Sequence, residues 1–237
     1  QASGGLTPGP GINLLDAPYL QAGVSCSHEW GMGPGTVSFL ALDAAVGDAR
    51  PCIVTLNHVG ALTLTKQHPA LQNFPKFYGT CLLQPGWNDG PEAQRGLMRY
   101  SQADGFGRGV VLLDEVPHSV NVMELAWFPM VNPERDKWLK SPTTATMVYG
   151  IGPITGRKAA GIGMPFISSG RTSGVVTGNV QIVPETIPAA YTTGDGRTFT
   201  TMLFTARLDG VFTQGDSGAP VLHRDTHELM GLVVAAA

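Results

Sequence analysis

The sequence predicts an all-β protein, and three observations support this. Glycine contributes 31 and proline 18 of the 237 residues, so together they form about a fifth of the chain, against roughly 12% on average usage. Only 14% of the residues are charged, where a typical domain has about 25%. Short apolar runs recur with glycine or proline between them, a spacing typical of antiparallel barrels or sandwiches rather than of βαβ units.

The same composition argues against several classes of protein. The low charge disfavours a coiled coil, a long polar helical bundle and a charged disordered tail. The formal net charge of −3 and the pI of about 6.1 disfavour a nucleic-acid partner, because such proteins need a basic surface. No apolar stretch reaches about 18 residues, so no membrane partner is expected.

The chain divides into four segments. Residues 1–21 are rich in glycine and proline without periodicity, which predicts an irregular N-terminal arm. Residues 22–130 and 143–237 carry the strand-like runs. Between them, residues 131–142 combine prolines with several charges and read as a surface connection.

Each expected strand is a short apolar run that ends near a turn signal. The run CIVTL at 52–56 is too short for a helix, for example, and the run at 36–42 is followed by Gly47 and Asp48. The expected strands cover residues 36–42, 52–56, 61–65, 96–100, 109–113, 121–128, 144–150, 166–169, 174–183, 199–208 and 229–234.

Three cysteines, at positions 26, 52 and 81, are too few and odd in number for a disulfide framework. Their spacing fits no zinc pattern, so neither a metal nor a cofactor is implied. We expect reduced, mostly buried thiols, which slightly favours a cytoplasmic over a secreted location.

The most informative segment is QGDSGAPVL at 214–222, which places Ser217 between glycines. Glycines let the chain turn tightly enough to aim successive backbone N–H groups at one point. Such a point beside a serine hydroxyl can stabilise the oxyanion of an acyl transfer. The sequence Gly-Asp-Ser-Gly at 215–218 also occurs in ordinary turns. The segment therefore indicates a nucleophilic serine only if the chain also supplies a base for it.

His58 is the strongest candidate for that base, because it stands at the end of the apolar run CIVTLN, where a strand can hold it rigidly. A base of this kind needs an acid to orient its ring. Glu124 is the only charged residue in NVMELAWF and is the leading candidate, since a carboxylate in an apolar strand needs a partner unless it faces outward from an edge strand. Asp114, which ends GVVLLD, is the alternative acid.

These segments resemble the chymotrypsin-like (trypsin-fold) serine peptidases, with histidine, acid and serine in that order. TLNHV at 55–59 resembles the histidine motif of the family, and GDSGAPV at 215–221 its serine motif. More narrowly, the chain resembles a bacterial branch that also includes plant narrow-leaf-type proteins. The segments that carry this likeness are GVS at 23–25, GTVSFL at 35–40, NHV at 57–59, QPGWNDG at 84–90, MELA at 123–126 and SGRTSGVVTGNV at 169–180.

The resemblance implies two antiparallel six-stranded β-barrels with the active site in the cleft between them. The first barrel, 22–130, would supply His58 and Glu124, and the second, 143–237, Ser217 and the pocket. It implies a serine endopeptidase acting on a protein or peptide substrate without a cofactor. Ser217 would be the nucleophile, His58 the general base and Glu124 the orienting acid, in place of the usual aspartate. The N–H groups of Gly215 and Ser217 would form the oxyanion hole.

The resemblance also implies where the substrate binds. Val211, six residues before the nucleophile, would set primary specificity and favour a small or apolar side chain. Val234, Ala235 and Ala236 would form the strand that pairs with the substrate backbone. In the family a further strand and a helix follow this position, so the resemblance implies a truncated C-terminus.

Two other functions stay open. The glutamate at the acid position and the early chain end are compatible with a non-catalytic trypsin-like fold that acts as a protein-binding module. A self-processing protease released from a larger chain is also compatible. Residues 1–21 offer no Ile-Val-Gly-Gly start, so we expect no N-terminal zymogen switch, and a regulatory partner or neighbouring domain is possible instead.

Three further features have structural interpretations. Asp89 is expected to cap its own turn. Arg171 could bind a carboxylate, but a structural role in the second barrel is favoured. The segment HRDTHE at 223–228 is expected at the polar tip of a hairpin rather than around a metal ion.

Overall fold

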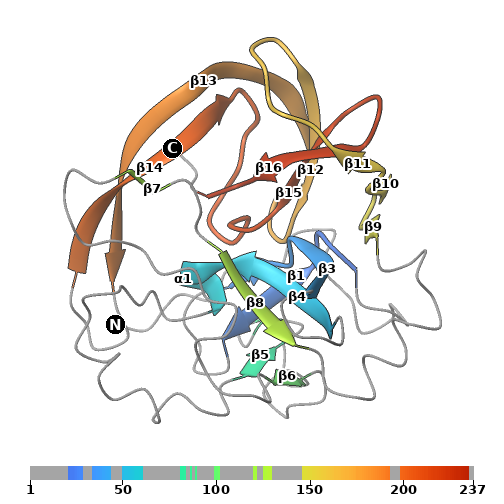
Figure 1. Cartoon of the computed structure of the whole chain (residues 1–237), viewed down its shortest axis with the longest axis vertical. Coiled ribbons are helices and arrows are strands. Elements are labelled where there is room, and N and C mark those ends of the chain that lie inside the picture. The colour runs from blue at the N-terminus through green and yellow to red at the C-terminus, as the bar shows by residue number, and fades with distance from the viewer. Residues whose placement is uncertain are drawn as a thin grey trace.

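The computed structural model describes residues 21–28, 34–43, 50–60, 81–83, 86, 89, 99–101, 120–121, 125–129, 146–192 and 198–234. These residues form two groups of strands packed against each other, one from the first half of the chain and one mainly from the second half (Figure 1). Among them, no helix is long and apolar enough to cross a membrane.

The first half contributes two small sheets. One sheet has the strand order β2-β1-β5-β6 and the other β3-β4-β8, and every pairing is antiparallel. A four-residue helix, α1 (Asn57–Gly60), follows β4 directly. The strands are β1 (Ser25–His28), β2 (Gly35–Thr36), β3 (Phe39–Asp43), β4 (Arg50–Leu56), β5 (Cys81–Leu83), β6 (Arg99–Ser101) and β8 (Leu125–Pro129).

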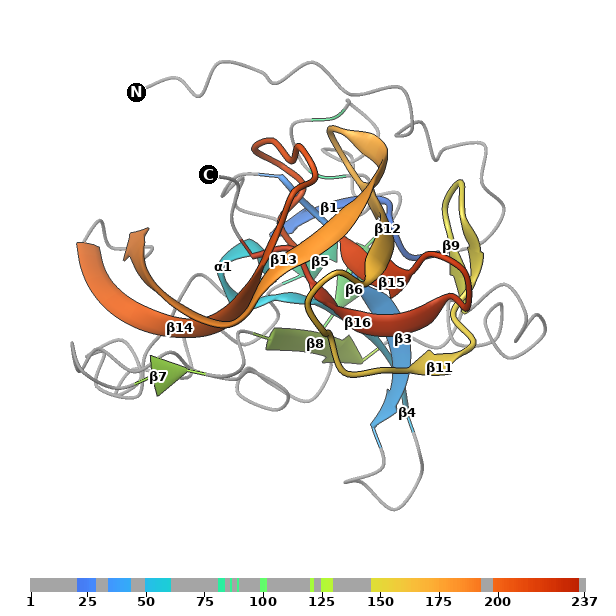
Figure 2. The same cartoon turned by 90° about the horizontal axis from the view of Figure 1, so that it is seen from above.

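The second half is built on one seven-stranded sheet of order β11-β16-β15-β12-β13-β14-β7. This sheet curls strongly and forms a half-barrel over the first half (Figures 1 and 2). Its strands are β7 (Val120–Asn121), β11 (Gly156–Arg157), β12 (Pro165–Gly170), β13 (Gly174–Thr192), β14 (Thr198–Leu208), β15 (Pro220–His223) and β16 (Glu228–Leu232). A separate pair joins β9 (Met147–Val148) and β10 (Gly152–Pro153).

Strand β13 is much longer than the run expected at 174–183. Its first part pairs with β12, but from Val180 onward its partner is β14. A strand with one partner tolerates proline, because the missing N–H removes no ladder bond. Pro184 and Pro188 therefore interrupt the apolar pattern without ending the strand. In Figure 2 the β13–β14 hairpin extends to one side of the molecule, with β7 beside it.

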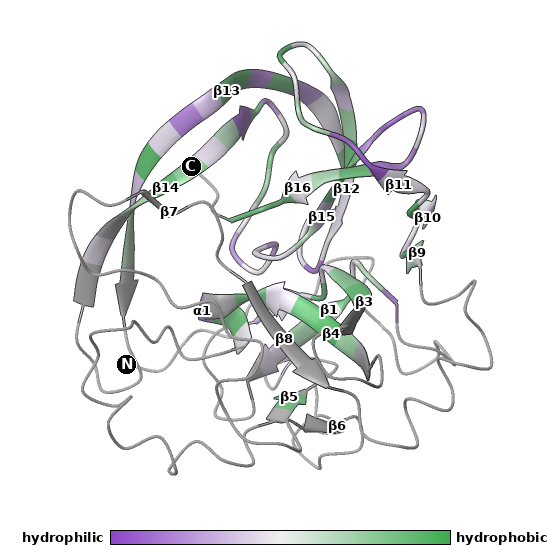
Figure 3. Cartoon of the chain, in the orientation of Figure 1, coloured by the Kyte–Doolittle hydropathy of each residue, from purple (hydrophilic) through white to green (hydrophobic). Residues whose placement is uncertain are grey.

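The core of the second half lies inside the curl of this sheet. It contains the buried side chains of Phe166, Val176, Ala219, Val221 and Val233. Among the residues of the first half that Figure 3 colours, hydrophobic ones lie mainly on β3 and β4. Leu56 and Ile53 on β4 are completely or almost completely buried.

The all-β class expected from the sequence is confirmed. The curled sheet forms a half-barrel, and complete closure into two six-stranded barrels goes beyond what the described residues show. The pairings β11–β16 and β14–β7 are parallel, which differs from a purely antiparallel sheet. Because β7 comes from the first half and pairs with β14, the two halves share this sheet.

Several local expectations can be compared directly. Of the run expected at 144–150, residues 147 and 148 form the two-residue strand β9 with a turn after it, and residues 144 and 145 lie outside the described residues. The segment at 223–228 forms the tip of the β15–β16 hairpin, as expected. Expected strands at 61–65 and 109–113 lie outside the described residues.

Candidate active site

The loop that carries Ser217 lies between β14 and β15 and turns on two glycines. Gly215 has φ of 103° and Gly218 has φ of 96°, a region that residues with a Cβ rarely adopt. The hydroxyl of half-buried Ser217 donates to the carbonyl oxygen of Val234 at 3.4 Å. The N–H of Gly218 donates to Val233 at 2.7 Å, which fixes the loop against the chain that leaves β16.

The same loop docks on strand β2 of the first half. The N–H of Thr36 donates to the carbonyl oxygen of Ser217 at 2.8 Å. A Cβ added at Gly218 would lie 2.3 Å from the carbonyl oxygen of Thr36, so the approach requires glycine. On β4, the Thr55 hydroxyl donates to that same oxygen at 2.9 Å.

His58 stands where the sequence places it, in the turn that follows β4. It is half-buried within α1, and the next residue, Val59, is 2% exposed. A Cβ added at Gly35 would lie 2.5 Å from both methyl groups of Val59 and 3.0 Å from the carbonyl oxygen of Ser217. The turn of His58 and the loop of Ser217 therefore meet at the same side of one glycine of β2.

Asp216, just before the candidate nucleophile, is completely buried. One carboxylate oxygen accepts the N–H groups of Thr172 and Ser173 at 2.8 and 3.0 Å, and the other accepts the N–H of Thr213 at 2.9 Å. These bonds satisfy the buried charge and tie the loop to the turn after β12. A Cβ at Gly170 would lie 2.4 Å from this carboxylate.

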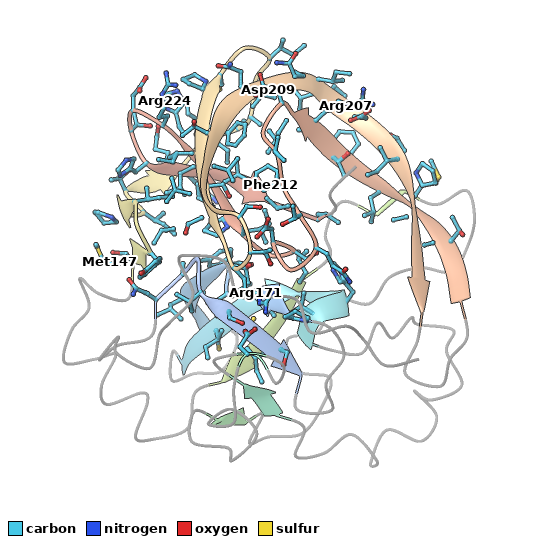
Figure 4. All side chains as sticks on the ribbon, turned by 180° about the vertical axis from the view of Figure 1, so that it is seen from behind. Met147, Arg171, Arg207, Asp209, Phe212 and Arg224 are labelled. Atoms are coloured by element: carbon cyan, nitrogen blue, oxygen red, sulfur yellow. The ribbon has the colours of Figure 1, made fainter. Side chains whose placement is uncertain are left out.

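A buried ion pair joins the two halves beneath the loop. The guanidinium of Arg171 is 0% exposed and the carboxylate of Asp89 is 1% exposed. Nε of Arg171 donates to both carboxylate oxygens, at 3.1 and 3.3 Å, and Nη2 makes a further contact. The Ser25 hydroxyl also bonds this carboxylate. In Figure 4, Arg171 lies at the boundary between the curled sheet and the strands of the first half.

This ion pair extends two expectations. The N–H of Asp89 closes a turn onto Gly86, at 2.8 Å, and its carboxylate binds Arg171. Arg171 does bind a carboxylate, and its structural role extends to both halves rather than the second barrel alone. The two residues are 82 positions apart, and the only signal in the sequence was that each is a charge within a glycine-rich motif.

Thr36 is a residue of this region to which the sequence assigned no individual role. Its buried hydroxyl accepts the backbone N–H of Arg171 and donates to the carbonyl oxygen of Gly215, both at 3.0 Å. Together with its bond to Ser217, this places Thr36 at the centre of the contacts between the halves. A threonine in a strand has no distinctive sequence signal.

The predicted pocket residues are only partly described. Val211 is 78% exposed in the loop after β14. Nearby Asp209 accepts the N–H of Asn179 and the amide of Gln181, and the bond to Asn179 is the main reason that the pKa of Asp209 is lowered. Figure 4 shows Asp209 far from Arg171, toward the other end of the curled sheet. Val234 packs with Leu203 of the extended hairpin.

Four predicted site residues lie outside the described residues, namely Glu124, Asp114, Ala235 and Ala236. The described strand β8 begins at Leu125, whose backbone pairs with Leu56. Leu56 is the last residue of β4, two positions before His58. Among the described residues, no group of three or more histidine, cysteine, aspartate or glutamate side chains could hold a metal ion.

Cys26 and Cys52 are both buried. Burial raises the pKa of the Cys26 thiol to about 12, although its hydrogen bond to the Thr55 hydroxyl partly opposes this and the charge of Asp89 adds to it. The thiol donates to that hydroxyl at 3.7 Å. The Cys26 thiol is therefore part of the packing between β1 and β4.

Solved structures with a similar arrangement are bacterial serine proteases. Thermobifida fusca protease A superposes with a TM-score of 0.52 and 16% identity, over 92% of this chain and 83% of that chain. Nocardiopsis protease superposes with a TM-score of 0.51 and 18% identity, over 90% of this chain and 81% of that chain. Cellulomonas bogoriensis chymotrypsin superposes with a TM-score of 0.50 and 14% identity, over 92% of this chain and 83% of that chain. This chain has the chymotrypsin-like fold.

The chymotrypsin-like fold confirms the structural part of the resemblance drawn from the sequence motifs. No sequence model of a protein family matches the chain, and no curated protein sequence is significantly similar to it. The identities of 14–18% establish the fold, so the chemistry has to be argued from the residues of this chain.

Proposed function

We propose that this protein is a serine endopeptidase, with Ser217 as nucleophile and His58 as general base. The observation that carries the proposal is the meeting of two segments at Gly35. The side chain of Val59, next to His58, and the carbonyl oxygen of Ser217 both lie within 3.0 Å of one point there. The segments that carry Ser217 and His58 therefore both contact strand β2, which supports their roles as nucleophile and base.

In the first step, Oγ of Ser217 attacks the carbonyl carbon of the scissile peptide and its proton passes to the imidazole of His58. The carbonyl oxygen becomes an oxyanion, which the N–H groups of Gly215 and Ser217 stabilise. The C–N bond then breaks, and the leaving amine takes the proton from the imidazolium. An acyl-enzyme remains on Ser217.

In the second step, water attacks the acyl carbon and gives a proton to His58. Collapse of the second tetrahedral intermediate breaks the bond to Oγ, which recovers its proton from the imidazolium. The acid product leaves and the enzyme returns to its starting state. No cofactor takes part in either step.

Glu124 is proposed as the acid that orients His58. The support is the pairing of Leu125 with Leu56, because these residues are the immediate neighbours of Glu124 and Asn57 in the chain. A glutamate is one methylene longer than the usual aspartate, so the strand or the side chain must accommodate the extra length. Asp114 remains the alternative acid.

The proposed substrate site lies on both sides of Ser217. Val211 would face the P1 side chain and select small or apolar residues, because it offers no charge to a lysine or arginine. Val234, with Ala235 and Ala236, would pair with the substrate backbone as an added strand. The bond from the Ser217 hydroxyl to Val234 supports the placement of that strand beside the nucleophile.

A fluorophosphonate probe tests the proposal directly. The wild-type chain should be labelled and should cleave denatured casein, while Ser217→Ala should do neither. His58→Ala should react at least about 100-fold more slowly, because proton transfer contributes roughly 10²–10⁴-fold. Ser173→Ala serves as a control, since it removes only an exposed contact with the Thr213 side chain and keeps the backbone bond from Ser173 to Asp216.

The outcomes separate the alternatives. Labelling that survives Ser217→Ala would place the reactive serine elsewhere. A wild-type chain that is neither labelled nor active would exclude the peptidase and favour the protein-binding module.

A further inference from the structure

The peptide bond between Gln214 and Gly215 has a side-chain tether that the catalytic scheme does not use. The hydroxyl of Thr172 donates to the carbonyl oxygen of Gln214 at 2.8 Å. In a planar trans peptide the C=O and the N–H point in opposite directions. The tether on the Gln214 carbonyl therefore also sets the direction of the Gly215 N–H.

Thr172 is itself held at several points. Its hydroxyl accepts Nη1 of Arg171 at 3.1 Å, so it has a donor partner and an acceptor partner at once. Its backbone N–H donates to the Asp216 carboxylate at 2.8 Å. Arg171 is fixed in turn by its buried ion pair with Asp89. A continuous set of contacts thus runs from the first half of the chain to the Gly215 peptide.

The tether depends on glycine at position 215. A Cβ added there would lie 2.4 Å from the Thr172 hydroxyl oxygen and 3.2 Å from Cδ of Arg171. Gly215 also has φ of 103°. Glycine is conformationally permissive, so a peptide before it can rotate unless something holds it, and the Thr172 hydroxyl does so.

We propose that Thr172 is a positioning residue for the oxyanion hole, acting through the Gln214 carbonyl on the direction of the Gly215 N–H, and that the Arg171–Asp89 pair holds its hydroxyl. The proposal rests on the serine peptidase function proposed above. It adds a specific link between a loop of the first half, which carries Asp89, and the transition-state binding site in the second half.

Thr172→Val removes the hydroxyl and keeps the shape, and Thr172→Ser keeps the hydroxyl. Steady-state kinetics would use a tetrapeptide p-nitroanilide with alanine at P1. Loss of a whole oxyanion-hole donor lowers kcat by about 10²–10³-fold. Loss of its tether should lower kcat about tenfold, which is about 1.4 kcal/mol, with KM changed less than about twofold.

A merely structural role would not produce this pattern. Thr172→Ser should return kcat to within about twofold of wild type, and the neighbouring Ser173→Ala should leave it unchanged. Inhibition by a peptide boronic acid, which forms a tetrahedral adduct, should weaken about tenfold in Thr172→Val. If kcat and boronate affinity are unchanged in Thr172→Val, or if KM alone rises, the proposal is overturned.

Crystal structures of the wild type and Thr172→Val test the role of Thr172 without relying on enzymatic activity. The proposal expects the Gln214–Gly215 peptide to rotate or to occupy two orientations in the variant. If the peptide keeps a single, unchanged orientation in the variant, the proposed role of Thr172 is overturned, whether or not the wild type is active. If the wild type cleaves no substrate, the proposed peptidase function is rejected separately.

Discussion

Arg171 and Asp89 form an ion pair from which water is excluded, with side-chain exposures of 0% and 1%. Arg171 follows β12 of the second half, and Asp89 lies in a segment of the first half. The backbone of Arg171 also bonds Thr36, which in turn bonds the carbonyl groups of Ser217 and Gly215. The pair therefore lies beneath the candidate catalytic loop and connects it to the other half of the molecule.

Breaking this pair from one side should destabilise the protein strongly. Asp89→Asn removes the carboxylate charge that is buried against the Arg171 guanidinium, and breaking a buried ion pair from one side typically lowers the free energy of unfolding by about 3–5 kcal/mol. The double variant Asp89→Leu with Arg171→Met removes both charges. Its free energy of unfolding should fall less than that of Asp89→Asn alone. Urea denaturation measures both. A double variant less stable than the single one would contradict this account.

Gly170 allows the carboxylate of Asp216 to approach the turn after β12. Gly170→Ala would place a methyl group 2.4 Å from Oδ1 of Asp216 and should lower the free energy of unfolding by about 1–3 kcal/mol, the usual effect of overpacking. Peptidase activity should fall with it, because Asp216 anchors the Ser217 loop. Gly231→Ala is the matched control, since a Cβ there has no neighbour within 4 Å. Equal stability of the two variants would refute the packing argument.

Cys26 should resist alkylation in the folded protein. With its pKa raised from 9.0 to about 12, the thiolate fraction at pH 8 is about a thousandfold lower than in the unfolded chain, and the thiolate is the reacting species. Iodoacetamide labelling followed by peptide mass spectrometry should modify position 26 only after urea is added. Rapid labelling without urea would show that the thiol is accessible.

The same shift predicts how stability depends on pH. Because folding favours the protonated thiol, its contribution is complete below about pH 9 and is lost as the pH rises toward 12. The free energy of unfolding of the wild type should fall over this range more steeply than that of Cys26→Val. Parallel curves for the two proteins would disprove the assignment.

Val211 should control the P1 preference without affecting the fold. Because the side chain is 78% exposed, Val211→Asp should change stability by less than about 0.5 kcal/mol. A carboxylate at the proposed pocket should raise kcat/KM for arginine at P1 at least about tenfold relative to alanine at P1. Cleavage of a peptide library reads out the preference, and an unchanged profile would remove Val211 from the pocket.

Local patterns in the sequence were sufficient for the class of fold and for two segments of the site. Glycine, proline and short apolar runs predict strands because these properties act within a few residues. GDSG at 215–218 predicts a tight turn around Ser217, and the strand end at His58 follows from CIVTLN. The length of β13 was not predictable, because its prolines are tolerated only where the strand has a single neighbour.

The contacts between the halves were decided by the tertiary structure alone. Asp89 and Arg171 are 82 residues apart, and Thr36 and Gly215 are 179 apart. Such pairings depend on which buried charges and carbonyl groups the folded chain brings together, and each partner has an ordinary local sequence. The sequence by itself therefore determined an all-β chain with a serine turn and a strand-end histidine. Only packing of the two halves decided that a buried ion pair, and the threonines beside it, hold that turn in place.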